Sequence, residues 1–443
     1  MNRQFTFKYG KGQVEFAIPE SQILHELTGR NRGAPADILS SYSSALDHPI
    51  DSPPLREMVK PGERILITVS DITRGWQRNG LVLPTLLDYL NEAGIRDKDM
   101  TIVIAVGAHR LNTPEEFVEL CGEEACHRVK VVNHDCRDYE NMDYYGKTSR
   151  GTEVWLNKLI SQHDRLITTG GVIYHYAVGF AGGRKSIMPG LSSLKTIQQC
   201  HMWCFNETVG MGANPMTDCG FTIGNPAHDD MMEVAAFAPP SFIINTVPNF
   251  EGQVCAVFTG NWISAWWEAV RVVEDMYGVK VDQEADIVIA TAGGYPKDIN
   301  LYQSQKTIHN AVAAMKPGGA AIIMAECPDF GEPAEFIDWF QHPTLLEMET
   351  AVRANFLISG FVATRQWQDG DKGTVILLTR PENTDKAGRA RMHACSAMDE
   401  AMSLAYKSCG TANPKVTLMP HGAHTWPIVP AHRTEPATAA VQS

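Results

Sequence analysis

RILITVSD (64–71) and MTIVIAVGAH (100–109) are two apolar runs on either side of LVLPTLLDYLNEA (81–93). Both runs are rich in Ile and Val and almost continuously apolar, which is typical of strands buried on both faces of a parallel sheet. The stretch between them has the apolar spacing of a helix. Strand, helix and strand in this order predict a βαβ unit, so this segment indicates an α/β fold.

The same alternation continues along the chain. Further strands are predicted at 129–135, 164–171, 241–247, 286–294, 320–327, 374–379 and 415–422, and a further long helix at 262–277. We therefore expect an α/β protein with two three-layer domains and mainly parallel sheets. Because ligands of such sheets bind beyond the carboxyl ends of the strands, the active site is expected in the cleft between the domains.

The predicted domain boundary lies near residue 280, where the helix 262–277 ends in Gly278 and a polar stretch follows. This gives an N-terminal domain over 1–280 and a C-terminal domain over 281–425. A helix rich in Ala and Met is predicted near 385–408 and is expected to pack back on the first domain. The tail 431–443 has no periodicity and is expected to be frayed.

The composition excludes several classes of protein. The chain has 443 residues, of which 44% are apolar and 20% charged, so it is globular rather than disordered. Its net charge of −13 disfavours nucleic acid and anionic membrane surfaces as partners. No segment has the apolar length of a membrane span, and MNRQFTFKYG (1–10) lacks the apolar core of a signal peptide. Ten cysteines without a CxxC pair fit reduced thiols, so we expect a cytoplasmic protein.

Charged and polar side chains collect where predicted strands end. Asp71 and Arg74 follow the first strand, His109 ends the second, and His175 follows the strand at 164–171. In the second domain, GGYPKD (293–298) follows the strand at 286–294. Any one of these could be a loop with a solvated charge, but four such ends together favour a shared site.

GGVIYHYAVGFAGGRKSIMPG (170–190) is the segment richest in such residues. Its Gly182, Gly183 and Ser186 flank Lys185, and glycines let backbone N–H groups approach an anion closely. The GxxxxGK[ST] spacing of a P-loop is absent. Lys185 is either an amine nucleophile in a partly desolvated loop or a point charge that binds phosphate, and its chemistry alone does not decide between them.

Three histidines are candidates for chemistry. His109 and His175 each lie at a strand end, and two such groups on opposite faces of a substrate carbon would suit a racemase or epimerase. His201 lies in QQCHMWC (198–204). The Cys-His-x-x-Cys cluster could bind a metal, but its spacing matches no common zinc motif, so a single imidazole ligand from His201 is the simpler hypothesis.

A candidate carboxylate site follows the glycine turn of the second domain. Gln303 and Lys306 are three residues apart in YQSQK (302–306), so at the start of a helix they share a face. An amide and an ammonium group on one face can hold the carboxylate of a hydroxy acid. The alternative is an ordinary exposed helix start.

Taken together, these motifs resemble the nickel-pincer-nucleotide lactate racemase family. The matching pieces are SDITR (70–74), GAHR (107–110), GGVIYHYAVGFAGGRKSIMPGL (170–191), His201 and GGYPKDINLYQSQK (293–306), with a weaker match at PHG (420–422). They occur in the family's order and with similar spacing. The resemblance implies an isomerase, a racemase or epimerase that inverts C2 of a small-molecule 2-hydroxy acid such as lactate, a larger aliphatic or aromatic acid, malate or a sugar acid.

The resemblance also implies a cofactor, a pyridinium-derived mononucleotide with two thiocarbonyl arms that carries nickel. One arm would be linked covalently to Lys185, and His201 would be the protein ligand of nickel. His109 and His175 would exchange the hydroxyl proton while the C2 hydride moves to the cofactor ring. The remaining implied residues are Asp71, Arg74, Gly182, Gly183, Ser186 and Trp367 for the cofactor, and Tyr302, Gln303 and Lys306 for the substrate. Cofactor-biosynthesis proteins would be maturation partners.

Two other functions remain open from the residues. Lys185 could form a Schiff base in a lyase or aldolase. A non-catalytic carrier of nickel or of the nucleotide would keep Lys185 and His201. Such a carrier would have no use for His109, His175 and the Gln303–Lys306 pair, whose presence favours the racemase.

Overall fold

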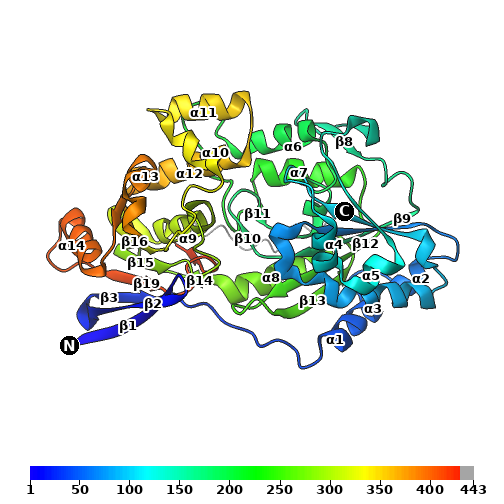
Figure 1. Cartoon of the computed structure of the whole chain (residues 1–443), viewed down its shortest axis with the longest axis horizontal. Coiled ribbons are helices and arrows are strands. Elements are labelled where there is room, and N and C mark those ends of the chain that lie inside the picture. Colours follow the sequence, from blue (N-terminus) through cyan, green and yellow to red (C-terminus); the bar gives the residue numbers. More distant parts are fainter. Residues whose placement is uncertain (430–443) are drawn as a thin grey trace. The chain divides into compact units, whose positions relative to one another are not determined.

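The computed structural model describes residues 1–429 and divides the chain into two units, each with its own sheet (Figure 1). The first unit comprises Asn31–Cys204 and Met216–Met276. The second comprises Met1–Arg30, Phe205–Pro215 and the chain from Tyr277. The predicted α/β class with mainly parallel sheets is confirmed. The predicted frayed tail, 431–443, lies outside the described residues.

The sheet of the first unit has six strands in the order β13-β12-β9-β4-β5-β6. The bounds are β4 Ile65–Ser70, β5 Met100–Ala105, β6 Lys130–Asn133, β9 Arg165–Gly171, β12 Phe242–Pro248 and β13 Val254–Gly260. All neighbours are parallel except β12 and β13. The sequence runs outward from β4 to β6 and then resumes at β9 on the other side of β4. The β4–β9 pair is therefore the point where the strand order reverses, the usual ligand position in such sheets.

Helices complete this unit. They are α1 Ile38–Asp47, α2 Leu55–Met58, α3 Asn79–Glu92, α4 Pro114–Cys121, α5 Glu123–Arg128, α6 Leu194–His201, α7 Pro226–Ala236 and α8 Ser264–Tyr277. On one face of the sheet, Leu83, Leu86 and Leu90 of α3 are completely buried in one core with Ile67 and Ile102. Burial of one such leucine contributes roughly 2 kcal/mol. Two small hairpins, β7 (Met142–Lys147) with β8 (Glu153–Asn157) and β10 (Tyr174–His175) with β11 (Gly179–Phe180), lie outside the main sheet.

The sheet of the second unit is wholly parallel, in the order β18-β17-β16-β15-β19-β3. The bounds are β3 Ile23–Glu26, β15 Ala285–Thr291, β16 Met315–Met324, β17 Thr374–Leu378, β18 His393–Cys395 and β19 Val416–Met419. Its helices are α9 Leu301–Ala313, α10 Ala334–Asp338, α11 Leu345–Ala354, α12 Ile358–Lys372, α13 Thr384–Arg389 and α14 Met398–Cys409. The strand order reverses between β15 and β19.

Two segments depart from the predicted division at residue 280. The first thirty residues belong to the second unit, because β3 adds a strand beside β19 and the hairpin of β1 (Asn2–Tyr9) with β2 (Gly12–Pro19) packs Phe7 and Phe16 into that unit's core. Residues 205–215 also join the second unit. The backbone N–H groups of Gly210 and Gly212 donate to a carboxylate oxygen of Glu349, at 2.9 and 2.7 Å.

The segment 385–408 also differs from the prediction. It is not one helix but α13, β18 and α14. Within its own unit, α14 buries Met398, Ala401 and Ala405 against β16 and β17. Within residues 1–429, none of the helices combines the length and the apolar character needed to cross a membrane.

Candidate active site

The carboxyl ends of β4 and β9 bring the predicted motifs of the first unit together. Asp71 follows β4 directly and begins a 3-10 helix, Ile72–Gln77. The chain after β9 forms the β10–β11 hairpin and then a second 3-10 helix, Gly183–Ser186, which contains Lys185. These segments leave neighbouring strands at the point of strand-order reversal, where ligands bind in this class of sheet.

Asp71 and His109 form a hydrogen-bonded pair. The carboxylate of Asp71 is 4% exposed, and its Oδ1 accepts from the backbone N–H of Thr73 at 3.2 Å and from the Thr73 hydroxyl at 2.6 Å. Its Oδ2 contacts Nδ1 of His109. Burial raises the pKa of Asp71, but the hydrogen bond from His109 and its charge, with Thr73 and Arg74, outweigh burial and lower the pKa overall. The ionised carboxylate therefore holds an Nδ1–H, which places the lone pair of the neutral ring on Nε2.

We expect Asp71→Asn to lower kcat/KM by on the order of 10²- to 10⁴-fold, because an amide can hold the other tautomer of His109 and leave no lone pair on Nε2. Thr73→Val is the matched control, since it removes a hydroxyl that Asp71 accepts from but leaves the His109 contact. Steady-state kinetics on both variants, with circular dichroism to check folding, provide the comparison. Equal losses in both would mean that Asp71 matters for the loop and not for His109.

His175 has the opposite tautomer. The backbone N–H of Ala177 donates to Nδ1 of His175 at 3.2 Å, so the proton of the neutral ring lies on Nε2. That Nε2 is 3.2 Å from Nζ of Lys185. His109 thus carries an acceptor at Nε2 and His175 a donor. One histidine can take a proton while the other gives one, as the paired acid and base of a racemase require.

The amine of Lys185 is easily deprotonated. Burial, followed by the charges of Arg184 and Arg74, lowers its pKa to about 7. About half of the lysine is therefore neutral at neutral pH, which makes it a competent nucleophile.

His201 is the last residue of α6, and its ring is oriented by the helix itself. Nδ1 lies 2.8 Å from the carbonyl oxygen of Ile197 and donates to it. Burial, with the charge of Lys185, lowers the pKa of His201 to about 4, so the ring is neutral with its lone pair on Nε2. A ligating histidine usually has its other N–H bound to a carbonyl in this way.

The Cys-His-x-x-Cys cluster is not arranged as a metal site. Among residues 1–429, no group of three or more His, Cys, Asp or Glu side chains is placed to hold a metal ion. Burial raises the pKa of Cys200 well above its usual value, so it is a thiol at neutral pH. A metal bound to His201 would need its other donors from a bound group.

The glycines of the lysine loop allow close packing. Gly182 and Gly183 have φ of +75° and +53°, and a Cβ on Gly183 would lie 2.8 Å from the indole of Trp266. The Gly183 N–H donates to the side-chain oxygen of Asn245 at 3.1 Å, and the Ser186 hydroxyl donates to the Thr169 carbonyl at 2.9 Å. These bonds fix the loop on β9 and β12. They give these glycines and Ser186 a role in placing Lys185.

In the second unit, Gln303 and Lys306 lie in the first two turns of α9, and both are exposed. The side chain of Asn300 caps this helix by accepting from the Gln303 N–H at 2.8 Å. Tyr302 packs its ring edge-to-face on Phe336, with centroids 5.3 Å apart. The helix follows β15, so the pair lies at the carboxyl edge where this sheet's strand order reverses.

More titratable groups gather here than the sequence suggested. Burial, followed by the charges of Lys297, Lys306 and His421, lowers the pKa of His424 well below its usual value. His421 and His424 therefore lie within electrostatic reach of Lys306, and they follow β19, the other strand of the reversal point. The sequence does contain a signal for His421 and His424, because they lie at or just after the end of a predicted strand, much as Gln303 and Lys306 do.

Comparison with known proteins identifies the family. Residues 9–212 match the family model described as Lactate racemase N-terminal domain, and residues 280–425 match Lactate racemase C-terminal domain. A lactate racemase from Lactiplantibacillus plantarum is 31% identical over 396 residues, which cover 86% of this chain and 89% of that protein. The chain belongs to the lactate racemase family. It is therefore an isomerase of the racemase type, as the resemblance implied.

Further comparisons also match this chain to lactate racemases. The lactate racemase of Thermoanaerobacterium thermosaccharolyticum is 33% identical over 335 residues, covering 75% of this chain and 76% of that one. The structure of a lactate racemase apoprotein from the same organism superposes with a TM-score of 0.86 at 30% identity, over 96% of this chain and all of that chain. A structure from Thermotoga maritima, 16% identical with a TM-score of 0.63, shares the fold alone.

Trp367 lies on α12, which packs against α9, the helix that carries the other predicted residues of its unit. The guanidinium of Arg391 is 4.6 Å from the centre of its ring. Arg391 directly precedes β18, and Trp367 is near the end of α12, which leads into β17. Asp369, two residues further along α12, accepts from the side-chain amide of Gln305, which lies between Gln303 and Lys306, at 3.2 Å. The role of Trp367 beside the cofactor stays a prediction from the resemblance.

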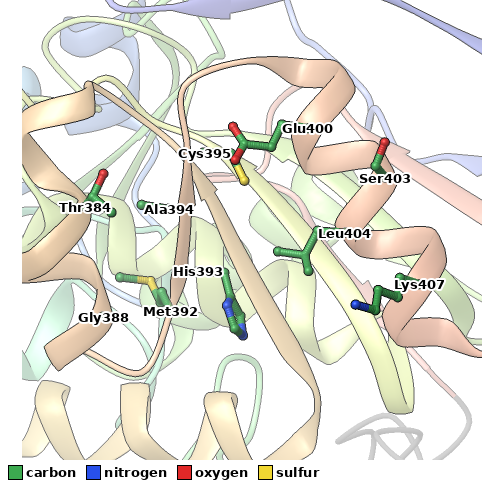
Figure 2. Close-up of a pocket in the computed structure, with 10 residues that line it drawn as sticks. All are labelled: Thr384, Gly388, Met392, His393, Ala394, Cys395, Glu400, Ser403, Leu404 and Lys407. Atoms are coloured by element: carbon green, nitrogen blue, oxygen red, sulfur yellow. The ribbon is translucent and has the colours of Figure 1, made fainter.

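A hollow of about 520 Å³ lies between α13, β18 and α14 of the second unit (Figure 2). Met392, His393, Cys395 and Leu404 are among its lining residues, and none of the predicted site residues contributes to it. The family's motifs lie at the carboxyl ends of strands in each sheet, and this hollow contains none of them.

Proposed function

We propose that this protein interconverts the two enantiomers of lactate and that it uses a nickel-pincer nucleotide bound through Lys185 and His201. The curated relatives are named lactate racemases, which supports lactate as substrate. One observation carries the proposal: four suitable side chains follow strand ends of the first unit or lie close to those that do. Lys185 is readily deprotonated, and His201 is neutral and held by its own helix. His109 and His175 have opposite tautomers.

The residues of the first unit fit such a cofactor. Lys185 offers an amine lone pair for an acyl arm, and His201 offers one imidazole nitrogen to the metal. Nickel(II) favours a near-planar set of nitrogen and soft sulfur donors, which a single histidine and a sulfur-bearing cofactor would supply together. When bound, the cofactor would provide the acceptor for the C2 hydride of the substrate.

The protein's own groups would manage the proton and the carboxylate. The C2 hydrogen of a hydroxy acid is a very poor proton, so the acid–base groups act on the hydroxyl instead. His109 would take the hydroxyl proton of one enantiomer through Nε2, and Asp71 would stabilise the resulting imidazolium. His175, which carries its proton on Nε2, would give a proton to the carbonyl oxygen of the keto acid when the other enantiomer forms, and would take it back in the reverse direction. Gln303 and Lys306 would hold the carboxylate.

The two rival functions are less consistent with these observations. A Schiff-base lyase would use Lys185 but would not need a neutral His201 whose Nε2 is oriented to bind a metal. A cofactor carrier would need neither the Asp71–His109 pair nor His175. Membership of a racemase family also favours isomerisation. We further propose that cofactor-biosynthesis proteins mature this chain in the cytoplasm.

We expect His201→Ala to lose most of its bound nickel, while His109→Ala and His175→Ala keep their nickel and lose activity by on the order of 10²- to 10⁴-fold. The reason is that His201 would donate to the metal whereas the others would carry a proton. Metal analysis of the three purified proteins, together with chiral analysis of lactate, tests this. Similar nickel loss in all three would contradict the division of roles, and no conversion of L- to D-lactate by the nickel-loaded wild type would contradict the function.

A further inference from the structure

Among residues 1–429, Arg184 is a buried cation without an acidic partner. Its side chain is 1% exposed, and its guanidinium donates to the Val178 carbonyl at 2.9 Å and to Nδ1 of His228 at 3.1 Å. It also lies 4.2 Å from the ring centre of Trp266. Carbonyl oxygens, a neutral imidazole and an aromatic face solvate a guanidinium without neutralising it. No ion pair is recorded for Arg184 within residues 1–429.

Lys185 follows directly and has no carboxylate partner among those residues either. Its Nζ is 3.2 Å from Nε2 of His175. Nδ1 of that ring already accepts from the Ala177 N–H, so the ring presents a hydrogen at Nε2. An ammonium group has no lone pair to accept it, whereas a neutral amine has one. The hydrogen-bond pattern around His175 therefore requires Lys185 in its neutral form.

We propose that Arg184 is a positioning residue whose fixed, uncompensated charge keeps Lys185 as a neutral amine, ready to be acylated by the cofactor. The proposal rests on the proposed function for the identity of the acylating group. Two cations in a desolvated loop without a carboxylate are unstable together, and one of them must lose its proton. Arginine holds its proton more tightly than lysine, so the lysine loses it.

Several other groups act on the charge of Lys185. Arg74, on the 3-10 helix after β4, adds to the effect of Arg184. His175 and His201 are neutral in the tautomers described above. Cys200 and Cys204 act in the opposite sense, but Cys200 is a thiol at neutral pH. The lowered pKa of Lys185, about 7, follows from burial first and from Arg184 second.

The consequence for chemistry is direct. An amine bonds to the carbon of a carboxyl-type arm through its lone pair, the bond from that carbon to its oxygen or sulfur leaving group breaks, and the leaving group takes up the proton that the nitrogen loses. The fraction of neutral Lys185 therefore sets how fast it can be acylated. That fraction rises with pH through the pKa of Lys185. Removing the charge of Arg184 would move the midpoint to higher pH and leave less neutral amine at pH 7.

The test is trace acetylation of the full-length apoprotein with acetic anhydride at a series of pH values, with the label on each lysine measured by peptide mass spectrometry. In the wild type we expect the labelling of Lys185 to reach half its maximum near pH 7. In Arg184→Gln, which can still donate to a carbonyl but has no charge, we expect the midpoint to rise by at least one pH unit, which is about a fivefold or larger loss of neutral amine at pH 7. In Arg184→Lys the charge at position 184 is no longer fixed, because a buried lysine can lose its own proton, so we expect a midpoint between those of the wild type and Arg184→Gln.

Labelling of the exposed Lys130 serves as the internal reference for reagent activity. Thermal melting checks that each variant is folded, and Arg184→Met is a second neutral variant that can still contact the ring of Trp266. A purely structural role for Arg184 would change stability without moving the midpoint. A wild-type midpoint in a folded neutral variant, or a wild-type Lys185 that labels only at strongly alkaline pH, would overturn the proposal. Because the assay contains neither cofactor nor lactate, its outcome is independent of whether the proposed function is right.

Discussion

Lys185→Ala is expected to carry no covalent adduct and to lose racemase activity by on the order of 10⁴-fold or more. The wild type, produced in a host that makes the cofactor, should exceed its calculated chain mass by the mass of a nucleotide. The physical reason is that Lys185 combines a nucleophilic amine with a fixed position, since its loop is bonded to β9 and β12 through Ser186 and Gly183. Intact mass spectrometry under denaturing conditions separates covalent from merely bound cofactor.

The control for this experiment is Lys195→Ala. Lys195 is a half-exposed lysine of the same unit, paired with Glu153 at 2.7 Å, and its loss should leave the adduct and the activity in place. Lys185→Arg should behave like Lys185→Ala, because a guanidinium keeps its proton and is not a nucleophile. An adduct on Lys185→Ala would place the attachment elsewhere, and a wild type of unmodified mass would contradict the covalent nucleotide.

The sequence predicted the central strands well because burial on both faces leaves a strong local signal. All nine predicted runs, from 64–71 to 415–422, are strands of the two sheets. Two of the strands that the sequence missed, β3 and β18, are too short to carry such a run, whereas β13 carries one, VCAVFTG. β3 and β18 are edge strands of four and three residues, and β13 pairs antiparallel at the other sheet's edge. The placement of residues 1–30 in the second unit depends on pairing across almost 400 residues, which no local pattern encodes.

Much of the candidate site could be listed from the sequence, but its chemistry could not. Asp71 was expected beside the cofactor, and its bond to His109 joins residues that are 38 positions apart. The tautomers of His109 and His175 depend on single hydrogen bonds to Asp71 and to the Ala177 N–H. The burial of Arg184 beside Trp266 likewise has no signature in the sequence. Motifs predict which residues meet, while three-dimensional contacts determine their protonation.

Deuterium at C2 of lactate is expected to remain with the substrate through racemisation, and the reaction is expected to be slower than with ordinary lactate. In the proposed function, the cofactor that Lys185 and His201 would hold would supply an acceptor for the C2 hydrogen as hydride. Such a hydrogen would not exchange with water, so the same deuterium would return to either face of planar pyruvate. The histidines handle the hydroxyl proton alone.

A simple two-base racemase makes the contrary prediction. One histidine would remove C2–D as a deuteron, and the other would deliver a proton that has exchanged with water, so nearly every inversion would wash out the label. The half-exposed His109, whose side chain is 44% accessible, would exchange readily with solvent. The experiment runs C2-deuterated L-lactate in ordinary water and follows both chirality and mass at early conversion. Retained deuterium in newly formed D-lactate supports hydride transfer, and complete early washout would exclude it even if Lys185 and His201 proved to bind the cofactor. His175→Ala and His109→Ala should slow inversion without releasing the label, because neither ring ever receives the C2 hydrogen.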